Sequence, residues 1–105
     1  MGGGYMKTKT RVIWKYHMYG NVVDLQLPKG ARILTVQTQR NLPRLWALVD
    51  PTESEIETRK FIGVETGEEL VYDTGREYQY INTFQQDAGS YVIHLFEIIE
   101  LNYEV

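Results

Sequence analysis

The chain has 105 residues, of which 43% are hydrophobic and 24% charged, a composition typical of one soluble globular domain rather than a disordered or fibrous protein. It contains no cysteine, which excludes disulfides, thiolate metal sites and cysteine nucleophiles. No apolar run is long enough to span a membrane, and no signal-peptide core is present, so we expect a cytoplasmic protein without a membrane partner. We predict a single β-domain over residues 8–105, preceded by a flexible N-terminal extension at residues 1–7.

The net charge of −3 conceals an asymmetry between the two halves of the chain. Residues 1–49 contain eight Lys or Arg and one acid, whereas residues 50–105 contain three bases and thirteen acids. In one interpretation, strands from the two halves pair and their charges interleave on solvated faces. In the other, the first half forms a positively charged concavity suited to a small anion or to the acids of a neighbouring copy. The acidic total argues against general nucleic-acid binding.

The hydrophobic pattern predicts seven short strands and no long helical segment, because β-branched and aromatic residues alternate with polar ones. The predicted strands are residues 8–18, 22–27, 31–40, 45–50, 56–65, 78–86 and 90–99. Residues 51–57 are predicted to form a loop or a single helical turn, residues 66–76 a long irregular connection, and Gly63 a bulge or a point of close approach. This spacing predicts an all-β fold, either a small antiparallel sandwich or a partly open barrel of about seven strands.

The stretch Gly30–Asp50 is predicted to be the central hairpin, because its strands are apolar on both faces. We expect both arms to be central strands, joined by a four-residue loop at Asn41–Arg44. Leu34 and Val36 are predicted to share one face of the first arm. Trp46, in the second arm, is predicted to lie in the core.

Six short motifs form a recognisable pattern: Lys15-Tyr16, PKGA at residues 28–31, VQTQ at 36–39, LWALVD at 45–50, FQ at 84–85 and HLFE at 94–97. Over roughly residues 9–98 the chain resembles a family of small uncharacterised proteins encoded in bacteriophages and prophages. Two positions depart from that pattern, since Arg44 replaces a cysteine and the tail from Ile98 runs past the usual end. The resemblance implies a phage setting in the cytoplasm of an infected bacterium and an accessory or counter-defence role.

Residues suited to catalysis are few. The chain has two histidines, His17 and His94, and no nucleophile-elbow or phosphate-cradling motif. Ser90 and His94 lie four apart on one predicted strand, about 13 Å by strand rise, which is too far for a hydrogen bond. His94 sits among apolar residues, where a histidine is more often a hydrogen-bonded core group than a catalyst. We therefore predict no catalytic residues, no metal site and no cofactor.

Two glutamines on an apolar strand are the start of a candidate binding site. Gln37 and Gln39 share a face, and a buried amide without a partner costs about 1–3 kcal/mol, so these glutamines need an explanation. One explanation is hydrogen bonding between strands or subunits. The other is a small-molecule pocket in which Arg32, Arg40 or Arg44 neutralises a phosphate.

A second set of aromatic and amide residues lies on the predicted strand 78–86. Tyr80, Asn82 and Phe84 are expected to share one face and, together with Trp46, to offer stacking surfaces. The predicted ligand-binding residues are therefore Gln37, Gln39, Arg40, Arg44, Trp46, Tyr80, Asn82 and His94.

The leading functional hypothesis is a non-enzymatic phage accessory protein that sequesters a small anionic ligand such as a nucleotide signal. The alternatives are a protein-interaction module that inhibits a host factor, and a small hydrolase. A concave, arginine-lined aromatic pocket would favour the first hypothesis, and a flat apolar patch the second. We also expect a homo-oligomer, in which residues 100–105 continue the last strand and dock on the basic half of a neighbouring copy.

Overall fold

The computed structural model describes residues 8–101, which form β-strands and one short 3-10 turn. The elements are β1 (Val12–His17), β2 (Val22–Pro28), β3 (Arg32–Gln39), β4 (Leu42–Val49), β5 (Ile56–Glu65), β6 (Arg76–Gln86), η1 (Asp87–Gly89) and β7 (Tyr91–Glu100). The prediction of an all-β fold is confirmed, and β5 has the predicted limits. Within the described residues no helix is long and apolar enough to cross a membrane. The predicted extension at residues 1–7 lies outside this range.

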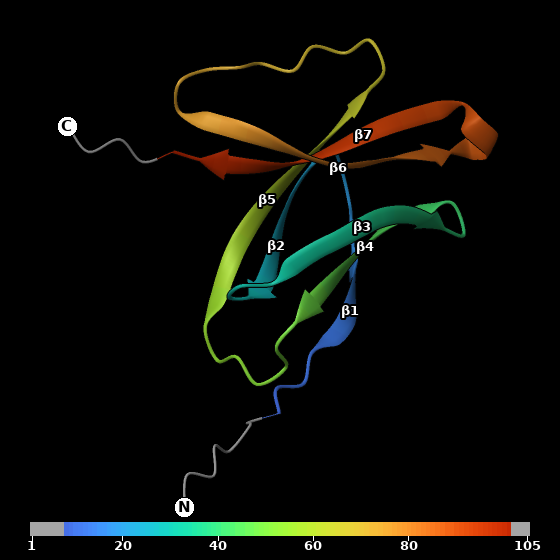
Figure 1. The fold of residues 1–105 in the computed structure, drawn as a ribbon. Coiled ribbons are helices and arrows are strands. Elements are labelled where there is room, and N and C mark those ends of the chain that lie inside the picture. The colour runs from blue at the N-terminus through green and yellow to red at the C-terminus, as the bar shows by residue number, and fades with distance from the viewer. Residues whose placement is uncertain (1–7, 102–105) are drawn as a thin grey trace, which may run out of the picture.

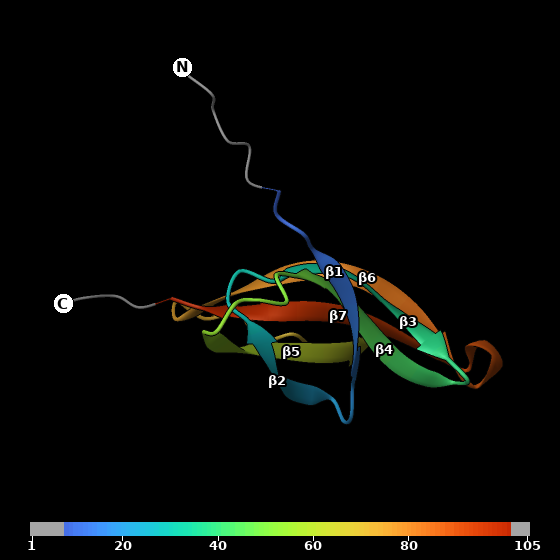
Figure 2. The ribbon, with the colours of Figure 1, turned by 90° about the horizontal axis from the view of Figure 1, so that it is seen from below.

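The strands form two antiparallel sheets that pack as a sandwich and do not close into a barrel (Figure 1). Sheet A has the strand order β1-β4-β3, and sheet B has the order β2-β5-β7-β6. Of the two predicted architectures, the sandwich is therefore correct. Figure 2 shows that β3, an edge strand of sheet A, and β6, an edge strand of sheet B, run side by side.

The core lies between the sheets and consists of the side chains at alternate strand positions that point inward. Each such side chain contributes about 1.5–3 kcal/mol when fully buried. Its main members are Val36, Leu45, Ala47 and Val49 from sheet A and Leu27, Phe61, Phe84 and Leu95 from sheet B. Trp46 is half-buried on the opposite side of β4, so its predicted place in the core is wrong.

The β3–β4 hairpin turns through two residues, not through the predicted four. Arg40 and Asn41 have φ values of 53° and 64°, and two successive positive φ angles are what a type I′ turn requires. Gln39 and Leu42 pair on either side of this turn. Pro43 therefore falls at the next pair, which does not exchange hydrogen bonds across the hairpin, and its missing N–H breaks no bond to β3.

A β-bulge in β3 changes which side chains share a face. The register with β4 shifts between Ile33 and Thr35. Ile33 consequently joins Val36 on the inner face, while Leu34 is exposed. The prediction that Leu34 and Val36 share a face is wrong for this reason.

A second bulge in β6 separates residues that were predicted to lie together. The register with β7 shifts between Tyr80 and Asn82, so that Tyr80 pairs with Phe96 and Asn82 with Leu95. Asn82 stays with Phe84 on the inner face, whereas Tyr80 turns to the outer face of sheet B. The predicted common face of Tyr80, Asn82 and Phe84 is therefore wrong.

The edge strands β3 and β6 meet along a seam that side-chain hydrogen bonds hold together. Asn82 Oδ1 accepts the Val36 N–H at 2.9 Å and the Thr35 hydroxyl at 3.3 Å. Farther along, Asn41 Oδ1 accepts the Asp87 N–H at 2.7 Å, and Asn41 Nδ2 donates to Asp87 Oδ1 at 2.5 Å. β3 is thus an edge strand of sheet A, and β6 covers it. The prediction that β3 is a central strand of its sheet is wrong.

The connections follow the turn chemistry of the sequence. Residues 51–55 form a loop in which Asp50 Oδ1 accepts the N–H and the hydroxyl of Thr52, at 3.0 and 2.6 Å. The predicted irregular connection is confirmed at residues 66–75, and Gly63 is a point of close approach. β7 ends at Glu100, and residues 102–105 lie outside the described range, so docking of the tail stays a prediction.

Candidate functional site

The outward side of sheet A gathers cationic, amide and indole side chains, and we call it the cationic face. Leu45, Ala47 and Val49 point into the core, so alternation along β4 turns Arg44 and Trp46 outward. The strand register places outward-pointing residues of β1 and β3 on either side of these two. The cationic face is thus formed by Lys15, His17, Arg32, Gln37, Gln39, Arg44 and Trp46.

The cationic face has no acid of its own. None of the three strands of sheet A contains Asp or Glu. Among the residues that the structure describes, Lys15, Arg32 and Arg44 have no carboxylate within ion-pair distance. Arg11, just before β1, lies 3.7 Å from Asp50, the acid that directly follows β4. The face therefore presents uncompensated positive charge.

Arg44 is the central residue of this face. It is only 9% exposed, and its Nη1 donates to the Pro43 carbonyl at 3.0 Å. A guanidinium has five N–H donors, so most of its hydrogen-bonding capacity is not used by this contact. No buried side-chain nitrogen or oxygen of the described chain lacks a partner, so the remaining donors of Arg44 reach the surface. Their fork geometry suits a phosphate or a carboxylate.

A side-chain bridge explains why Arg44 is so enclosed on an outward face. Lys15 Nζ, on β1, donates to Gln39 Oε1, on β3, at 2.9 Å. In the register, Lys15 pairs with Trp46 of β4, and Gln39 pairs with Leu42 of β4. Since β4 lies between β1 and β3, the bridge crosses β4 midway between Trp46 and Leu42, which is the position of Arg44. One cluster consequently contains the Lys15 ammonium, the Arg44 guanidinium and the side-chain amides of Gln37 and Gln39.

Five of the eight predicted ligand-binding residues belong to this region. Gln37, Gln39, Arg44 and Trp46 lie on the cationic face, and Arg40 is in the turn at its end. Both glutamines are exposed, so their amides are not the buried, costly groups that the prediction assumed. Gln39 Oε1 accepts from Lys15 and Gln37 Nε2 donates to the Thr35 hydroxyl at 3.5 Å, and the other amide groups of the two glutamines can contact a partner in solvent.

The other three predicted residues lie elsewhere, on sheet B. Asn82 faces inward and holds the seam with Val36, so it is a structural joint. Tyr80 lies on the outer face of sheet B, where its ring meets Phe96 edge to face, with 5.6 Å between centroids. Neither shares a surface with Arg44 or Trp46.

His94 forms a hydrogen-bonded chain on the outer face of sheet B. Its Nδ1 lies 2.8 Å from the Thr83 hydroxyl and its Nε2 2.7 Å from the Thr66 hydroxyl. Thr83 in turn lies 2.7 Å from the Tyr80 hydroxyl. Both ring nitrogens thus have hydrogen-bond partners, as expected for a hydrogen-bonded core group, but the half-buried ring lies on the outer face of sheet B and not in the core.

Sequence reasoning missed Lys15 and His17 as members of the cationic face. Alternation within residues 12–17 places both on one side of the strand. Their position beside Arg44 depends on the pairing of β1 with β4, which a single sequence does not specify.

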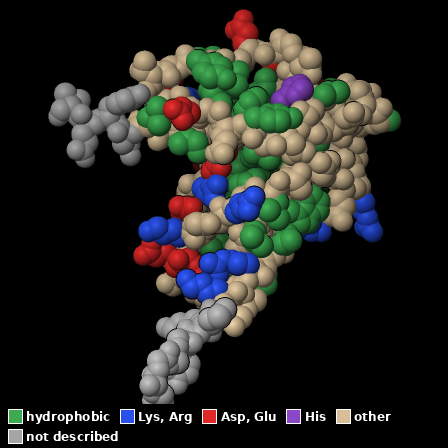
Figure 3. All heavy atoms as spheres, in the orientation of Figure 1, with side chains coloured by type: hydrophobic (Ala, Val, Ile, Leu, Met, Phe, Trp, Pro, Cys, Tyr) green, Lys and Arg blue, Asp and Glu red, His purple; other side chains and the backbone are tan. Residues whose placement is uncertain are grey.

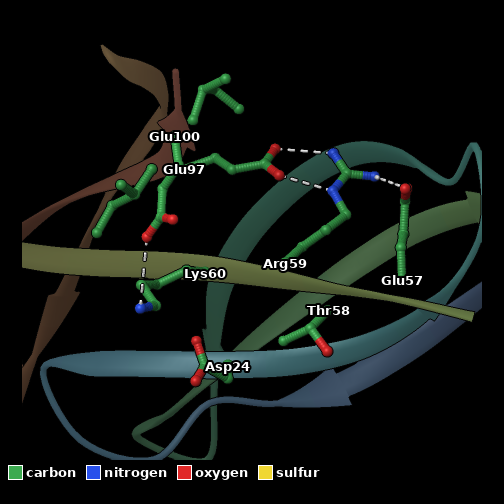
Figure 4. A pocket seen from close by; sticks show the side chains of 9 residues that line it. Asp24, Glu57, Thr58, Arg59, Lys60, Glu97 and Glu100 are labelled. Carbon is green, nitrogen blue, oxygen red and sulfur yellow. Dashed lines mark hydrogen bonds and ion pairs between the residues drawn. The ribbon is translucent and has the colours of Figure 1, made fainter. Parts of the chain in front are cut away.

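A separate hollow on sheet B also contains cations, but each of them is paired with an acid (Figure 4). Arg59 donates to both carboxylate oxygens of Glu97, at 2.6 and 2.7 Å, and lies 3.8 Å from Glu57. The hydrogen bonds from Arg59 to Glu97 raise the pKa of the guanidinium, and burial opposes that rise. Lys60 faces Glu100 at 3.8 Å. In this hollow the acids outnumber the cations by four to two, and each cation faces an acid, so it offers no unpaired cation to an anionic ligand.

In the described part of the chain, no group of three or more His, Cys, Asp or Glu residues is arranged so that it could hold a metal ion.

Comparison with known proteins gives a match to a family model described as "Domain of unknown function (DUF7352)", which covers residues 9–104. The chain belongs to this family. The DUF7352 match includes the tail from Ile98 that the resemblance had placed beyond the family's usual end. No match was found among curated proteins or among solved structures.

Proposed function

We propose that this DUF7352 protein is a non-enzymatic binding protein that takes a small phosphate-bearing ligand, such as a nucleotide, on the cationic face. The observation that carries the proposal is Arg44, an enclosed guanidinium with spare donors and no carboxylate partner among the described residues. Withdrawing a charge from water without a counter-charge is unfavourable. A bound anion would supply the missing charge.

The neighbours of Arg44 fit the parts of a nucleotide. Arg44 and Lys15 would contact the phosphate, because a guanidinium fork and an ammonium both bind phosphate oxygens. The half-buried Trp46 ring, next on the same side of β4, would stack on the base. The exposed amides of Gln37 and Gln39 would donate to and accept from the edge of the base.

A second candidate function is inhibition of a host protein through the same surface. It is favoured by the open form of the cationic face, which is a sheet surface and not a deep pocket, and by the exposed Ile13 on its β1 side. An acidic protein surface would cover a larger part of such a face than a nucleotide would.

The phage setting and the counter-defence role that the resemblance implies belong to this proposal. In that setting, capture of a nucleotide signal would lower its free concentration in the host. The hydrolase alternative would require a carboxylate or a histidine that converges with a metal or a nucleophile. Both ring nitrogens of His94 bond to threonine hydroxyls, and His17 Nδ1 lies 3.1 Å from the Tyr19 hydroxyl. We favour binding without turnover.

A thermal-shift screen against mono-, di- and cyclic nucleotides tests the proposal. A ligand at 100 times its Kd adds about 2.7 kcal/mol to the free energy of unfolding, so the melting temperature should rise. Arg44→Gln should abolish that rise. Arg76→Gln is the matched control, because Arg76 is exposed on β6 and already pairs with Asp73 at 3.3 Å. If no nucleotide raises the melting temperature, or if both variants respond alike, the nucleotide proposal fails.

A further inference from the structure

One open end of the sandwich contains an apolar hollow of about 250 Å³ that is separate from the cationic face. It lies where the β1–β2 turn, the start of β4 and the β6–β7 hairpin come together. Both sheets contribute to its walls. The apolar hollow is lined mainly by Met18, Val23, Leu42, Phe84, Ile93 and Leu95.

Gly63 gives this end of the sandwich its shape. Its N–H donates to the Asn21 carbonyl at 2.8 Å, which draws the β1–β2 turn onto β5. A Cβ on residue 63 would lie 3.0 Å from Ile93 Cγ2, so Ile93 would have to shift by a few tenths of an ångström. The glycine thus lets Ile93 keep its place in the wall of the hollow.

A second, acidic hollow of about 300 Å³ adjoins the first. The two share Asn21, Gly63, Gln86 and Ile93 in their walls, so they form one continuous depression. The acidic hollow adds the side chains of Glu65, Glu68, Asp87 and Tyr91.

The three carboxylates of the acidic hollow have no basic partner within ion-pair distance in the part of the chain that the structure describes. Two of them are held in position by other groups. Glu68 Oε1 accepts the Glu65 N–H at 2.9 Å, and Asp87 Oδ1 accepts from Asn41 Nδ2 at 2.5 Å. They therefore place negative charge at the mouth of the apolar hollow.

We infer that the joined hollows bind a small organic cation in which an apolar ring is linked to an ammonium group, the chemistry of an arylalkylamine. The apolar hollow falls below the roughly 300–1,000 Å³ typical of sites for whole drug-sized ligands, so it accommodates a ring-sized group. The ammonium then lies among the carboxylates of the acidic hollow. The acidic hollow therefore favours a cationic ligand, whereas the cationic face favours an anionic one.

Tryptamine is a suitable probe, with indole-3-propionate and ethylamine as controls. We expect calorimetry or ligand-observed NMR to detect tryptamine binding to the full chain. Indole-3-propionate has the ring with the opposite charge, and ethylamine has the ammonium without the ring. Indole-3-propionate should bind about fivefold more weakly, since one surface charge contact is worth up to about 1 kcal/mol. Ethylamine should bind at least about fivefold more weakly, because it buries no ring. If indole-3-propionate binds as well as tryptamine, or if tryptamine does not bind at millimolar concentration, the inference is overturned.

Glu68→Gln removes one carboxylate charge but keeps a carbonyl that can accept the Glu65 N–H, so the fold is preserved. We expect it to weaken tryptamine binding about threefold to fivefold. Glu77→Gln, an exposed acid of β6 outside both hollows, is the matched control and should leave the Kd unchanged. Leu42→Trp, at the rim of the apolar hollow, should block the ring. Equal tryptamine binding by Glu68→Gln and wild type contradicts the site even if Leu42→Trp fails to fold.

Discussion

Sheets A and B each contain an arginine that is largely withdrawn from water, but they compensate its charge in different ways. Arg59, in β5, is locked to Glu97 by two hydrogen bonds and lies near Glu57. Arg44, in β4, makes its one side-chain hydrogen bond within the described residues to the carbonyl of Pro43. In the lower half of Figure 3, basic side chains (blue) at the left lie among acidic ones (red). Basic side chains at the right lie beside hydrophobic side chains (green) and uncharged atoms (tan).

This contrast separates a structural cation from an available one. The donors of Arg59 are consumed inside the sandwich, so changing this residue should affect stability first. The donors of Arg44 are directed at the surface, so changing it should affect binding first. The predictions below test this contrast and the architecture that produces it.

The largest effect is expected from Glu97→Ala. This change leaves the enclosed Arg59 guanidinium without its main partner, and breaking a buried pair in this way typically costs about 3–5 kcal/mol. Arg44→Gln, which removes no ion pair, should lower the free energy of unfolding by no more than about 1 kcal/mol. Urea denaturation of both variants measures the difference. Similar losses in the two variants would show that the contrast between the arginines is false.

A smaller loss is expected at the seam between the sheets. Asn82→Ala removes the acceptor of the Val36 N–H, and leaving such a group unsatisfied costs about 1–3 kcal/mol. The loss should be local at first, so amide exchange at Val36 should accelerate more than exchange at Phe61 in the core. Gln85→Ala, an exposed change on the same strand, is the control. Unchanged exchange at Val36 would argue against the seam.

The smallest effect concerns Asp50, the acid at the border of sheet A. Hydrogen bonds from Thr52 hold the pKa of its carboxyl below the usual value of 3.8, and Arg11 adds to this. A lowered folded-state pKa stabilises the protein above the unfolded pKa, and the contribution is lost as the pH falls through the lowered value. Melting curves of wild type and Asp50→Asn should therefore differ at pH 6 and converge once the pH falls below the lowered pKa of Asp50. A difference independent of pH would contradict this assignment.

The alternation of side chains was enough to predict most of the fold. Strand β5 has its predicted limits because a segment with β-branched and aromatic residues runs from Ile56 to the turn at Thr66-Gly67. Alternation also placed Gln37 and Gln39 on one face, and this part of the candidate site needed only the period of a strand. Arg44 was assigned to the loop, so its place beside Trp46 on one face of β4 was not predicted.

The bulges and the pairing of distant strands were not predictable. The bulges at Leu34 and Ile81 each shift the inward–outward alternation by one residue. The sequence shows no sign of either bulge, because both positions hold ordinary apolar residues and not glycine. The two-residue turn was hidden because Pro43 suggested a longer loop. The neighbourhood of Lys15 and Arg44 depends on β1 pairing with β4, a contact between distant segments.

The two tryptophans permit the most direct test of the cationic face. Trp46 lies on that face, whereas Trp14 points to the other side of sheet A, opposite Ala47. In an NMR titration with the nucleotide that stabilises the protein best, the indole N–H signal of Trp46 should shift together with the backbone signals of Gln37 and Arg44, while that of Trp14 stays in place. A shift of Trp14 without Trp46, or changes confined to Tyr80 and His94 on sheet B, would contradict the account.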